Sequence, residues 1–256
     1  MTDQPMTRPG EITGWPKLVV TYPTDPANIA PLLPPGIEPR EPKVILAFYC
    51  VPVLGEPEYG VTVKVPAAWK GVEGAYSLGM GIDQEAAVHI SAETNGQPKF
   101  LCNVTLFRLG DTVTARATHQ GFTFVEYTGS IVGSVEPRAG DYTEHEWWTK
   151  YSRAIGGAEG RYDFPPHVVD VATTFEQRHV EDVHGELVLH ESPWDPIAQY
   201  LPVVGAPSAQ LVTQQPKARV ITNTGPLDPD AFWPFADVIG GSRWPGDRGG
   251  PRTSDR

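Results

Sequence analysis

The sequence predicts a mainly β protein of the α+β class, closed into a barrel or a sandwich, and three observations support this prediction. Short segments rich in β-branched and aromatic residues recur along the chain. Turns that contain glycine or proline separate these segments, and few segments have the pattern of a helix. Many short strands with few helices are typical of barrels and sandwiches, and closure also removes exposed strand edges.

The first predicted elements lie near the N-terminus. Residues 18–22 are rich in strand-forming side chains. Thr24 or Asp25 can cap a helix whose first turn holds Pro26. The long apolar run 44–53 then fits a buried strand.

A half-buried strand and a short helix follow. Residues 60–65 alternate between apolar side chains and small or polar ones, as a strand with one buried face does. Asp83 is expected to cap a helix that carries Ala86, Ala87 and Ile90 on one side.

The second half of the chain is predicted to be mostly strands. A meander of antiparallel strands with glycine-containing turns is expected over 100–108, 112–119 and 122–132. Residues 144–154 are predicted to form an amphipathic helix that buries one residue of the pair Trp147-Trp148. The remaining strands are expected over 168–175, 185–190 and 218–222.

Composition bounds the domain organisation and excludes some partners. A chain of 256 residues is long enough for one large domain, which we place at 13–239. The segments 1–12 and 240–256 are expected to be flexible termini, because the tail is rich in glycine, proline and charge. The net charge of −11 argues against a nucleic-acid or anionic-membrane partner, since both require clustered cations.

The cysteines and the apolar runs predict a cytoplasmic protein. Cys50 and Cys102 show neither a disulfide framework nor metal-ligand spacing. The N-terminus lacks the apolar core of a signal peptide, and no apolar run approaches the ~20 residues that cross a bilayer.

Lys99 is the most informative residue. It stands between Pro98 and Phe100 at a loop-to-strand junction, and no other charge lies between Glu93 and Arg108. Lysines at strand starts are usually solvated. If Lys99 instead points inward, burial disfavours its charged form, and a neutral amine is a nucleophile for ketones.

Several segments resemble, in order, the motifs of the acetoacetate decarboxylase superfamily. The similarity spans roughly 14–223, including an early strand and helix. The core motif comprises Val-Glu-Gly-Ala-Tyr at 72–76, Asp-Gln-Glu-Ala-Ala at 83–87, Ser-Ala-Glu at 91–93 and Pro-Lys-Phe at 98–100. Later matches are Ala-Arg-Ala-Thr at 115–118, the Ser-Pro-Trp-Asp-Pro stretch within 190–197 and Leu-Pro-Val at 201–203.

This resemblance implies a cone-like, mostly antiparallel barrel in which Lys99 faces a cavity and forms the Schiff base. By the same alignment Phe100 replaces a second lysine, so burial alone would have to activate Lys99. Gly60 stands where the family has a catalytic glutamate, and Trp15 stands near the family arginine that meets the substrate carboxylate. Small gaps would restore Glu56 or Glu58 to the cavity.

Other residues are candidates for the same site. Glu93 matches the glutamate of the family turn and is a candidate for positioning the lysine, with a solvated loop carboxylate as the alternative. Tyr76 is a candidate cavity donor, with core packing as the alternative. Asp83 and Glu85 are explained by helix capping, and His89 is more simply structural than a proton shuttle. Substrate contacts are therefore expected from Trp15, Tyr76, Phe100, Gly60 and Glu58, and catalysis from Lys99 and Glu93.

The resemblance implies a lyase that uses no metal or organic cofactor. A lysine iminium draws electrons from the bond to a β-carboxylate, so the expected activity is decarboxylation of a β-keto acid other than acetoacetate. The same enamine can attack an aldehyde, which leaves an aldolase or dehydratase as an alternative. A non-catalytic protein that binds a small keto acid or ketone is the third reading. Because relatives are oligomeric, we expect a homo-oligomer.

One further cluster resembles a metal site only superficially. His179, Asp182 and His184 match no defined zinc spacing, so we expect a solvated hairpin there.

Overall fold

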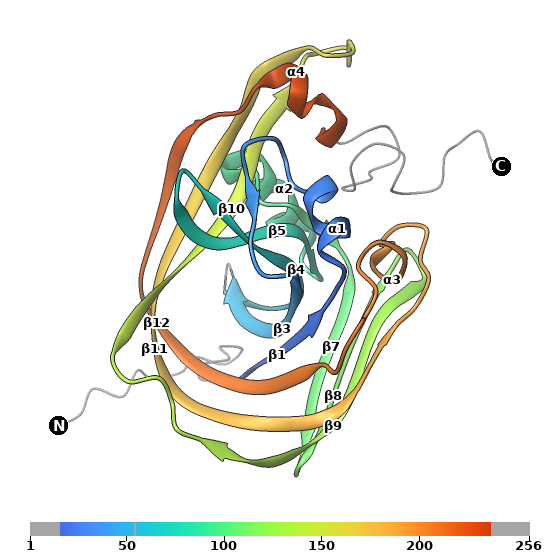
Figure 1. The fold of residues 1–256 in the computed structure, drawn as a ribbon, viewed down its shortest axis with the longest axis vertical. Helices are drawn as coiled ribbons and strands as arrows, with labels where there is room; N and C mark the ends of the chain where they lie inside the picture. Colours follow the sequence, from blue (N-terminus) through green and yellow to red (C-terminus); the bar gives the residue numbers. More distant parts are fainter. Residues whose placement is uncertain (1–15, 54, 237–256) are drawn as a thin grey trace.

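The computed structural model describes residues 16–53 and 55–236, which form a mostly β structure with few, short helices (Figure 1). The mainly β prediction is therefore confirmed. The strands are β1 (Lys17–Pro23), β2 (Glu38–Pro39), β3 (Lys43–Val53), β4 (Glu56–Trp69), β5 (Val72–Ile82), β6 (Lys99–Leu101), β7 (Asn103–Leu109), β8 (Thr112–His119), β9 (Phe122–Val135), β10 (Asp141–Arg153), β11 (Tyr162–Leu189) and β12 (Ser208–Pro226). The helices are α1 (Pro26–Ile29), η1 (Ala30–Leu32), α2 (Glu85–Asn95), α3 (Ile197–Tyr200), α4 (Pro229–Phe232) and η2 (Trp233–Phe235).

The strands of the described residues join in one sheet, in the order β10-β5-β4-β3-β1-β12-β11-β9-β8-β7. The short strands β2 and β6 pair with β4 and β5, beside this path. β10 pairs with β5 and also with β11. The strand pairings therefore form a closed path, which runs through β10, β5, β4, β3, β1, β12 and β11 and returns to β10. The long strands β11 and β12 run side by side over most of their length (Figure 1).

Strand β1 shows how the sheet separates two environments. Leu18, Val20 and Tyr22 are fully buried in the main hydrophobic core. Burying each such side chain contributes about 1.5–3 kcal/mol. Because side chains alternate along a strand, Lys17 projects from the opposite face. The Tyr22 hydroxyl donates to the carbonyl of Leu201 at 3.1 Å, which satisfies the polar atom within the core.

The helix predicted over 144–154 is wrong, because this segment belongs to strand β10. β10 pairs antiparallel with β11 and, over two residues, parallel with β5. Trp147 and Trp148 are both buried, at 1% and 3% exposure, and pack in two different apolar clusters. A strand with both faces covered accepts two consecutive tryptophans, whereas an amphipathic helix buries only one side.

The helix signals near the N-terminus are confirmed for α1 and corrected for α2. The Asp25 side chain accepts from the backbone N–H of Ala27, and Pro26 occupies the first turn of α1. In α2 the N-cap is Gln84, which makes no capping hydrogen bond with its side chain. Asp83 instead accepts from the backbone N–H of Tyr59 at 2.9 Å.

The meander is confirmed as β7, β8 and β9, but the later strands are longer than predicted. The expected strands over 168–175 and 185–190 are parts of one 28-residue strand, β11. His179 and Asp182 therefore lie within a paired strand and not in a hairpin, because register shifts let β11 continue past this polar stretch. Asp182 accepts from the Gln210 side chain.

Other expectations concern the ends of the chain and bound ions. The predicted flexible termini lie outside the described residues. No helix within 16–53 and 55–236 is long and apolar enough to cross a membrane. In the same part of the chain, no three His, Cys, Asp or Glu side chains gather as metal ligands.

Gly96 fixes the exit of α2 three residues before Lys99, and its replacement by alanine should destabilise the protein. Its φ of +68° is left-handed, and an added Cβ would lie 2.7 Å from the backbone nitrogen of Lys150. Gly110, with φ +59° and no atom near its Cβ position, is the matched control. Left-handed backbone alone costs alanine roughly 1–2 kcal/mol. Urea unfolding should show this loss for Gly110→Ala and a larger loss for Gly96→Ala. Equal losses would contradict the close approach.

Candidate active site

Lys99 is placed by the chain that leaves α2. Gly96 ends the helix, and the carbonyl of Pro98 accepts from the backbone N–H of Met80 on β5. Strand β6 then begins with Lys99, which is the pairing partner of Met80. Because side chains alternate along β6, Phe100 enters the main core and Lys99 projects from the other face.

The Lys99 amine is buried against a carboxylate. Its Nζ lies 2.9 Å from Oε2 of Glu58, and the two side chains are 6% and 2% exposed. The Tyr49 hydroxyl donates to the other carboxylate oxygen, Oε1, at 3.2 Å. Burial and the adjacent Glu58 carboxylate raise the pKa of Tyr49 well above its ordinary value, so the phenol remains a donor. Lys99, Glu58 and Tyr49 therefore form one hydrogen-bonded group.

Gly60 makes room for this group. An added Cβ would overlap the Tyr49 ring, with the ring atom Cε2 at 2.8 Å. Tyr49 and Gly60 are partners across strands β3 and β4, which brings the ring over the glycine. Gly60 thus contributes space and no chemistry of its own.

A second buried ion pair lies on the same side of the sheet. Lys64 on β4 is 2.7 Å from Glu146 on β10, and their side chains are 19% and 18% exposed. The Ser77 hydroxyl donates to Glu146 at 2.6 Å, and the Trp148 indole N–H also donates to it. Because the carboxylate has three donors, its negative charge is well satisfied.

The pKa values of this pair shift toward the charged forms. Burial acts to raise the pKa of Glu146, but Lys64 and the hydrogen-bond donors outweigh burial and hold it below its usual value. Burial likewise acts to lower the pKa of Lys64, but Glu146 outweighs it and raises this pKa. Both groups are therefore charged at neutral pH.

Lys17 is another lysine on this side of the sheet. Its Nζ lies 5.4 Å from the centre of the Phe175 ring, a cation–π distance. Burial lowers the pKa of Lys17 from its ordinary value, the Glu144 carboxylate opposes this shift, and the nearby Lys64 adds to it. Within the described residues Lys17 forms no ion pair, unlike Lys64 and Lys99.

This arrangement differs from the expectation that burial alone activates Lys99. The amine has an anionic neighbour, Glu58, that is positioned to take its proton. A carboxylate within hydrogen-bond distance of an amine can act as a general base and later return the proton. Loss of that proton to Glu58 leaves an uncharged nucleophile in the interior.

The structure brings together only some of the residues predicted for the site. Glu58 contacts Lys99 directly, and Gly60 lies beneath Tyr49. Phe100 packs in the core 4.7 Å from the His119 ring, so it does not line the site.

Tyr76 and Glu93 make their described contacts with other groups. Tyr76 packs against the main core, and its hydroxyl lies 3.4 Å from the Thr149 hydroxyl. Glu93 lies exposed in the last turn of α2, where its backbone carbonyl accepts from Lys150. Trp15 lies outside the described residues.

Four residues on this face were not predicted from the sequence: Tyr49, Lys64, Glu146 and Lys17. The sequence contained a signal that Lys64 faces away from the core. Lys64 interrupts an apolar run and alternates with valines that are buried. No comparable signal marked Glu146, because the segment around it was interpreted as a helix.

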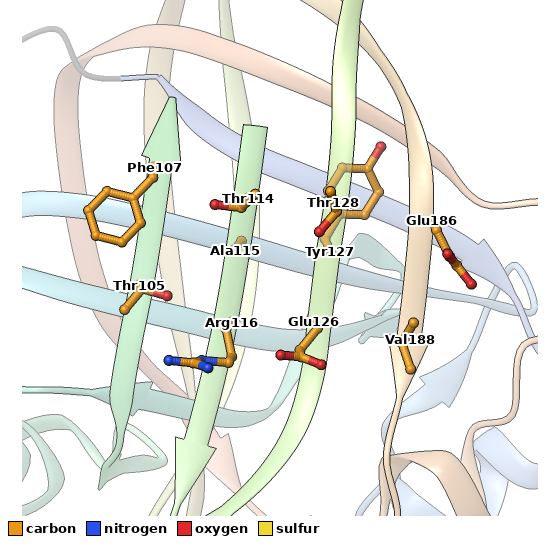
Figure 2. A pocket seen from close by; sticks show the side chains of 10 residues that line it. All are labelled: Thr105, Phe107, Thr114, Ala115, Arg116, Glu126, Tyr127, Thr128, Glu186 and Val188. Atoms are coloured by element: carbon orange, nitrogen blue, oxygen red, sulfur yellow. The ribbon is translucent and has the colours of Figure 1, made fainter. Parts of the chain in front are cut away.

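Two hollows on the described part of the surface lie elsewhere. One of about 350 Å³ lies over strands β7, β8, β9 and β11 and is lined by Phe107, Arg116 and Glu126 among others (Figure 2). The other, of about 500 Å³, is lined in part by Val19 and Thr21, which share the face of β1 that carries Lys17. Neither is lined by Lys99.

Comparison with known proteins places this chain in a family. The family model described as acetoacetate decarboxylase matches residues 2–222. The chain belongs to the acetoacetate decarboxylase family. Lys99 lies within the matched region, as do Glu58 and Tyr49.

Named relatives of the acetoacetate decarboxylase family match part of the chain. The acetoacetate decarboxylase of Paraburkholderia phytofirmans is 35% identical over 98 residues, covering 38% of this chain and 39% of that protein. Acetoacetate decarboxylase 1 of Bradyrhizobium diazoefficiens is 38% identical over 85 residues, covering 32% of this chain and 34% of that protein. The matched segments thus span well under half the length of these relatives.

Solved structures of the family share the fold over most of the chain. The acetoacetate decarboxylase of Legionella pneumophila superposes with a TM-score of 0.68 at 20% identity, covering 88% of this chain and 92% of that one. The enduracididine biosynthesis enzyme MppR, complexed with the condensation product of pyruvate and imidazole 4-carboxaldehyde, gives a TM-score of 0.61 at 16% identity. That match covers 80% of this chain and 86% of MppR.

Removing one member of the buried pair should destabilise the protein more than removing both. Glu58→Leu leaves the Lys99 ammonium buried without its anion, which costs about 3–5 kcal/mol. Adding Lys99→Met to that variant removes the stranded charge and should restore most of the loss. The measurement is the free energy of urea unfolding for the two single variants and the double variant. Additive losses would show that the two side chains do not interact.

Proposed function

We propose that this chain is a Schiff-base-forming lyase that decarboxylates a β-keto acid other than acetoacetate through an iminium on Lys99. The observation that carries this proposal is the Lys99 amine, 6% exposed and 2.9 Å from the Glu58 carboxylate. Membership of the acetoacetate decarboxylase family and the names of the matched relatives support it. The reaction needs no metal or organic cofactor, because the lysine supplies the electron sink.

Glu58 prepares the amine for attack. Its carboxylate takes a proton from the Lys99 ammonium, and the free electron pair on Nζ forms a bond to the ketone carbon. The carbonyl oxygen is protonated and leaves as water, with Glu58 as the acid. The product is an iminium on Lys99, and Glu58 is again a carboxylate. Tyr49 holds Oε1 of this carboxylate throughout, which leaves Oε2 directed at Lys99.

The iminium then breaks the carbon–carbon bond. Electrons of the bond to the substrate carboxylate move toward the iminium nitrogen, carbon dioxide leaves, and an enamine remains. A proton from solvent, passed through Glu58, adds to the enamine carbon. Water then hydrolyses the new iminium, which releases the ketone and restores the Lys99 ammonium. One proton is consumed in each turnover.

We infer that the strands close into a cone-like barrel and that the reaction takes place in its interior. The path through β10, β5, β4, β3, β1, β12 and β11 supports this inference. Lys17, Tyr49, Lys64 and Glu146 belong to strands of that path, and Glu146 on β10 reaches Lys64 on β4 over the strand β5 between them. Exclusion of water from such an interior strengthens each charge interaction.

A condensing enzyme is the second candidate. MppR, which has the same fold, was solved with a condensation product of pyruvate and an aldehyde. The enamine on Lys99 could form a carbon–carbon bond with an aldehyde by the same chemistry. Release of carbon dioxide separates the two reactions.

Reductive trapping tests the nucleophile. Borohydride added together with a β-keto acid should leave a reduced adduct on Lys99, seen by peptide mass spectrometry. Lys99→Arg should give no adduct and no turnover, because a guanidinium stays charged and cannot form the imine. Lys43→Arg, which alters a surface lysine paired with Glu41, should behave as the wild type. An adduct on another lysine, or none across a broad ketone panel, would remove Lys99 from the mechanism.

Substitution of the two candidate glutamates should separate their roles. Glu58→Gln should lower kcat for carbon dioxide release by about 10²–10⁴, the usual contribution of a general acid–base group. Glu93→Gln should leave kcat unchanged, because that side chain is exposed on α2. The measurement is steady-state carbon dioxide release from a β-keto acid. A larger loss for Glu93→Gln would instead support the family-based assignment.

A further inference from the structure

Near the Lys99 site, Lys17 is a lysine without a close carboxylate partner among the described residues. Lys99 is paired with Glu58, and Lys64 is paired with Glu146. Lys17 has no such partner among the described residues, although it projects from the same face of the sheet. A partly buried ammonium without a carboxylate is under-compensated, and an anionic ligand would compensate it.

The surroundings of Lys17 support a binding role and not a structural one. The Phe175 ring lies below its Nζ at 5.4 Å and offers weak cation–π support. Glu144 acts on Lys17 only at a distance and lies exposed on β10. The burial that lowers the pKa of Lys17 leaves its charge poorly stabilised until an anion arrives.

Three neighbouring strands connect the Lys99 pair with Lys17. Lys99 contacts Glu58 on β4, and Glu58 contacts Tyr49 on β3. The register Leu18↔Phe48 places Lys17 beside Tyr49 on the neighbouring strand β1. Lys17 therefore lies two strands from the strand that carries Glu58, on the same face of the sheet.

We propose that Lys17 receives a second acidic group of the substrate, several bonds away from the ketone that reacts with Lys99. The substrate class is then a β-keto dicarboxylic acid. One carboxylate leaves as carbon dioxide, and the remote one stays bound to Lys17. This proposal rests on the Lys99 chemistry above and adds the identity of the substrate's far end.

The position of Lys17 suits an anchor better than a partner of the leaving carboxylate. A cation paired with the leaving carboxylate would stabilise the ground state and slow the loss of carbon dioxide. A cation bound to the remote carboxylate interacts equally with the ground state and the transition state. It therefore acts on KM and holds the ketone against Lys99.

Open space lies further along the same face of β1. Val19 and Thr21 follow Lys17 at alternate positions of the strand and line the hollow of about 500 Å³. Strands β11 and β12 supply other walls of this hollow, including Asp182 and Gln210. The face of β1 that carries Lys17 is therefore open to solvent beyond Lys17 itself.

Two matched substrates test the proposal. β-Ketoadipate and β-ketohexanoate have the same six-carbon chain, and only the first has a second carboxylate. Wild-type protein should show a kcat/KM for β-ketoadipate at least tenfold above that for β-ketohexanoate, with carbon dioxide and levulinate as its products. In Lys17→Met this ratio should fall to near one through a higher KM. Lys17→Arg, which keeps the charge, should retain most of the preference, and Lys43→Met should retain all of it.

A binding measurement keeps the proposal independent of turnover. Adipate should bind the wild-type protein more tightly than hexanoate in calorimetry, and Lys17→Met should abolish this difference. Equal binding of the two acids, or an equal loss of kcat/KM for both keto acids in Lys17→Met, would overturn the proposal. If adipate is preferred but borohydride traps no keto acid on Lys99, the proposed lyase activity fails while the anion site stands.

Discussion

The buried pair between Lys99 and Glu58 is the interaction on which the site depends. Neither charge would be tolerated alone at this depth, because removing an ion from water costs several kcal/mol. Together they keep a nucleophile and its base within one hydrogen bond, at 2.9 Å. Tyr49 completes the pair, because its phenol occupies the carboxylate oxygen that the lysine does not use. The surrounding strands hold these three groups from different parts of the chain.

The charges near the Lys99 site are arranged differently from those of the protein as a whole. The chain carries a net charge of −11, whereas Lys99 and Lys64 are each paired with one carboxylate and Glu144 acts on Lys17 from a distance. An acidic surface repels anions at long range, whereas a local cation attracts them at short range. The proposed selection of an anionic ligand would therefore be made inside the fold and not during its approach.

The mainly β class, the meander and the capping of α1 by Asp25 could be predicted because each depends on local patterns. The strand β10 could not, since Trp147, Trp148 and Thr149 are buried in succession and the segment lacks the alternation of a one-sided strand. Lys99 was identified from its sequence context and family resemblance, but its partner Glu58 comes from 41 residues earlier. The pairing of β6 with β5 and of β5 with β4 brings the two residues together, and no short-range pattern reports it. Glu93 was favoured by alignment alone, and the end of α2 turns it toward solvent.

Because Tyr49 lies close to Gly60, the residue that is tolerated at position 60 depends on the residue at position 49. A carboxylate grafted at 60 would occupy the volume of the aromatic ring, and the ring would have to be replaced by something smaller. A general base at position 60 therefore requires a small residue at position 49. A general base at position 58 is compatible with the phenol of Tyr49, so the two arrangements exclude each other. Anyone engineering this scaffold must exchange the two positions as a unit.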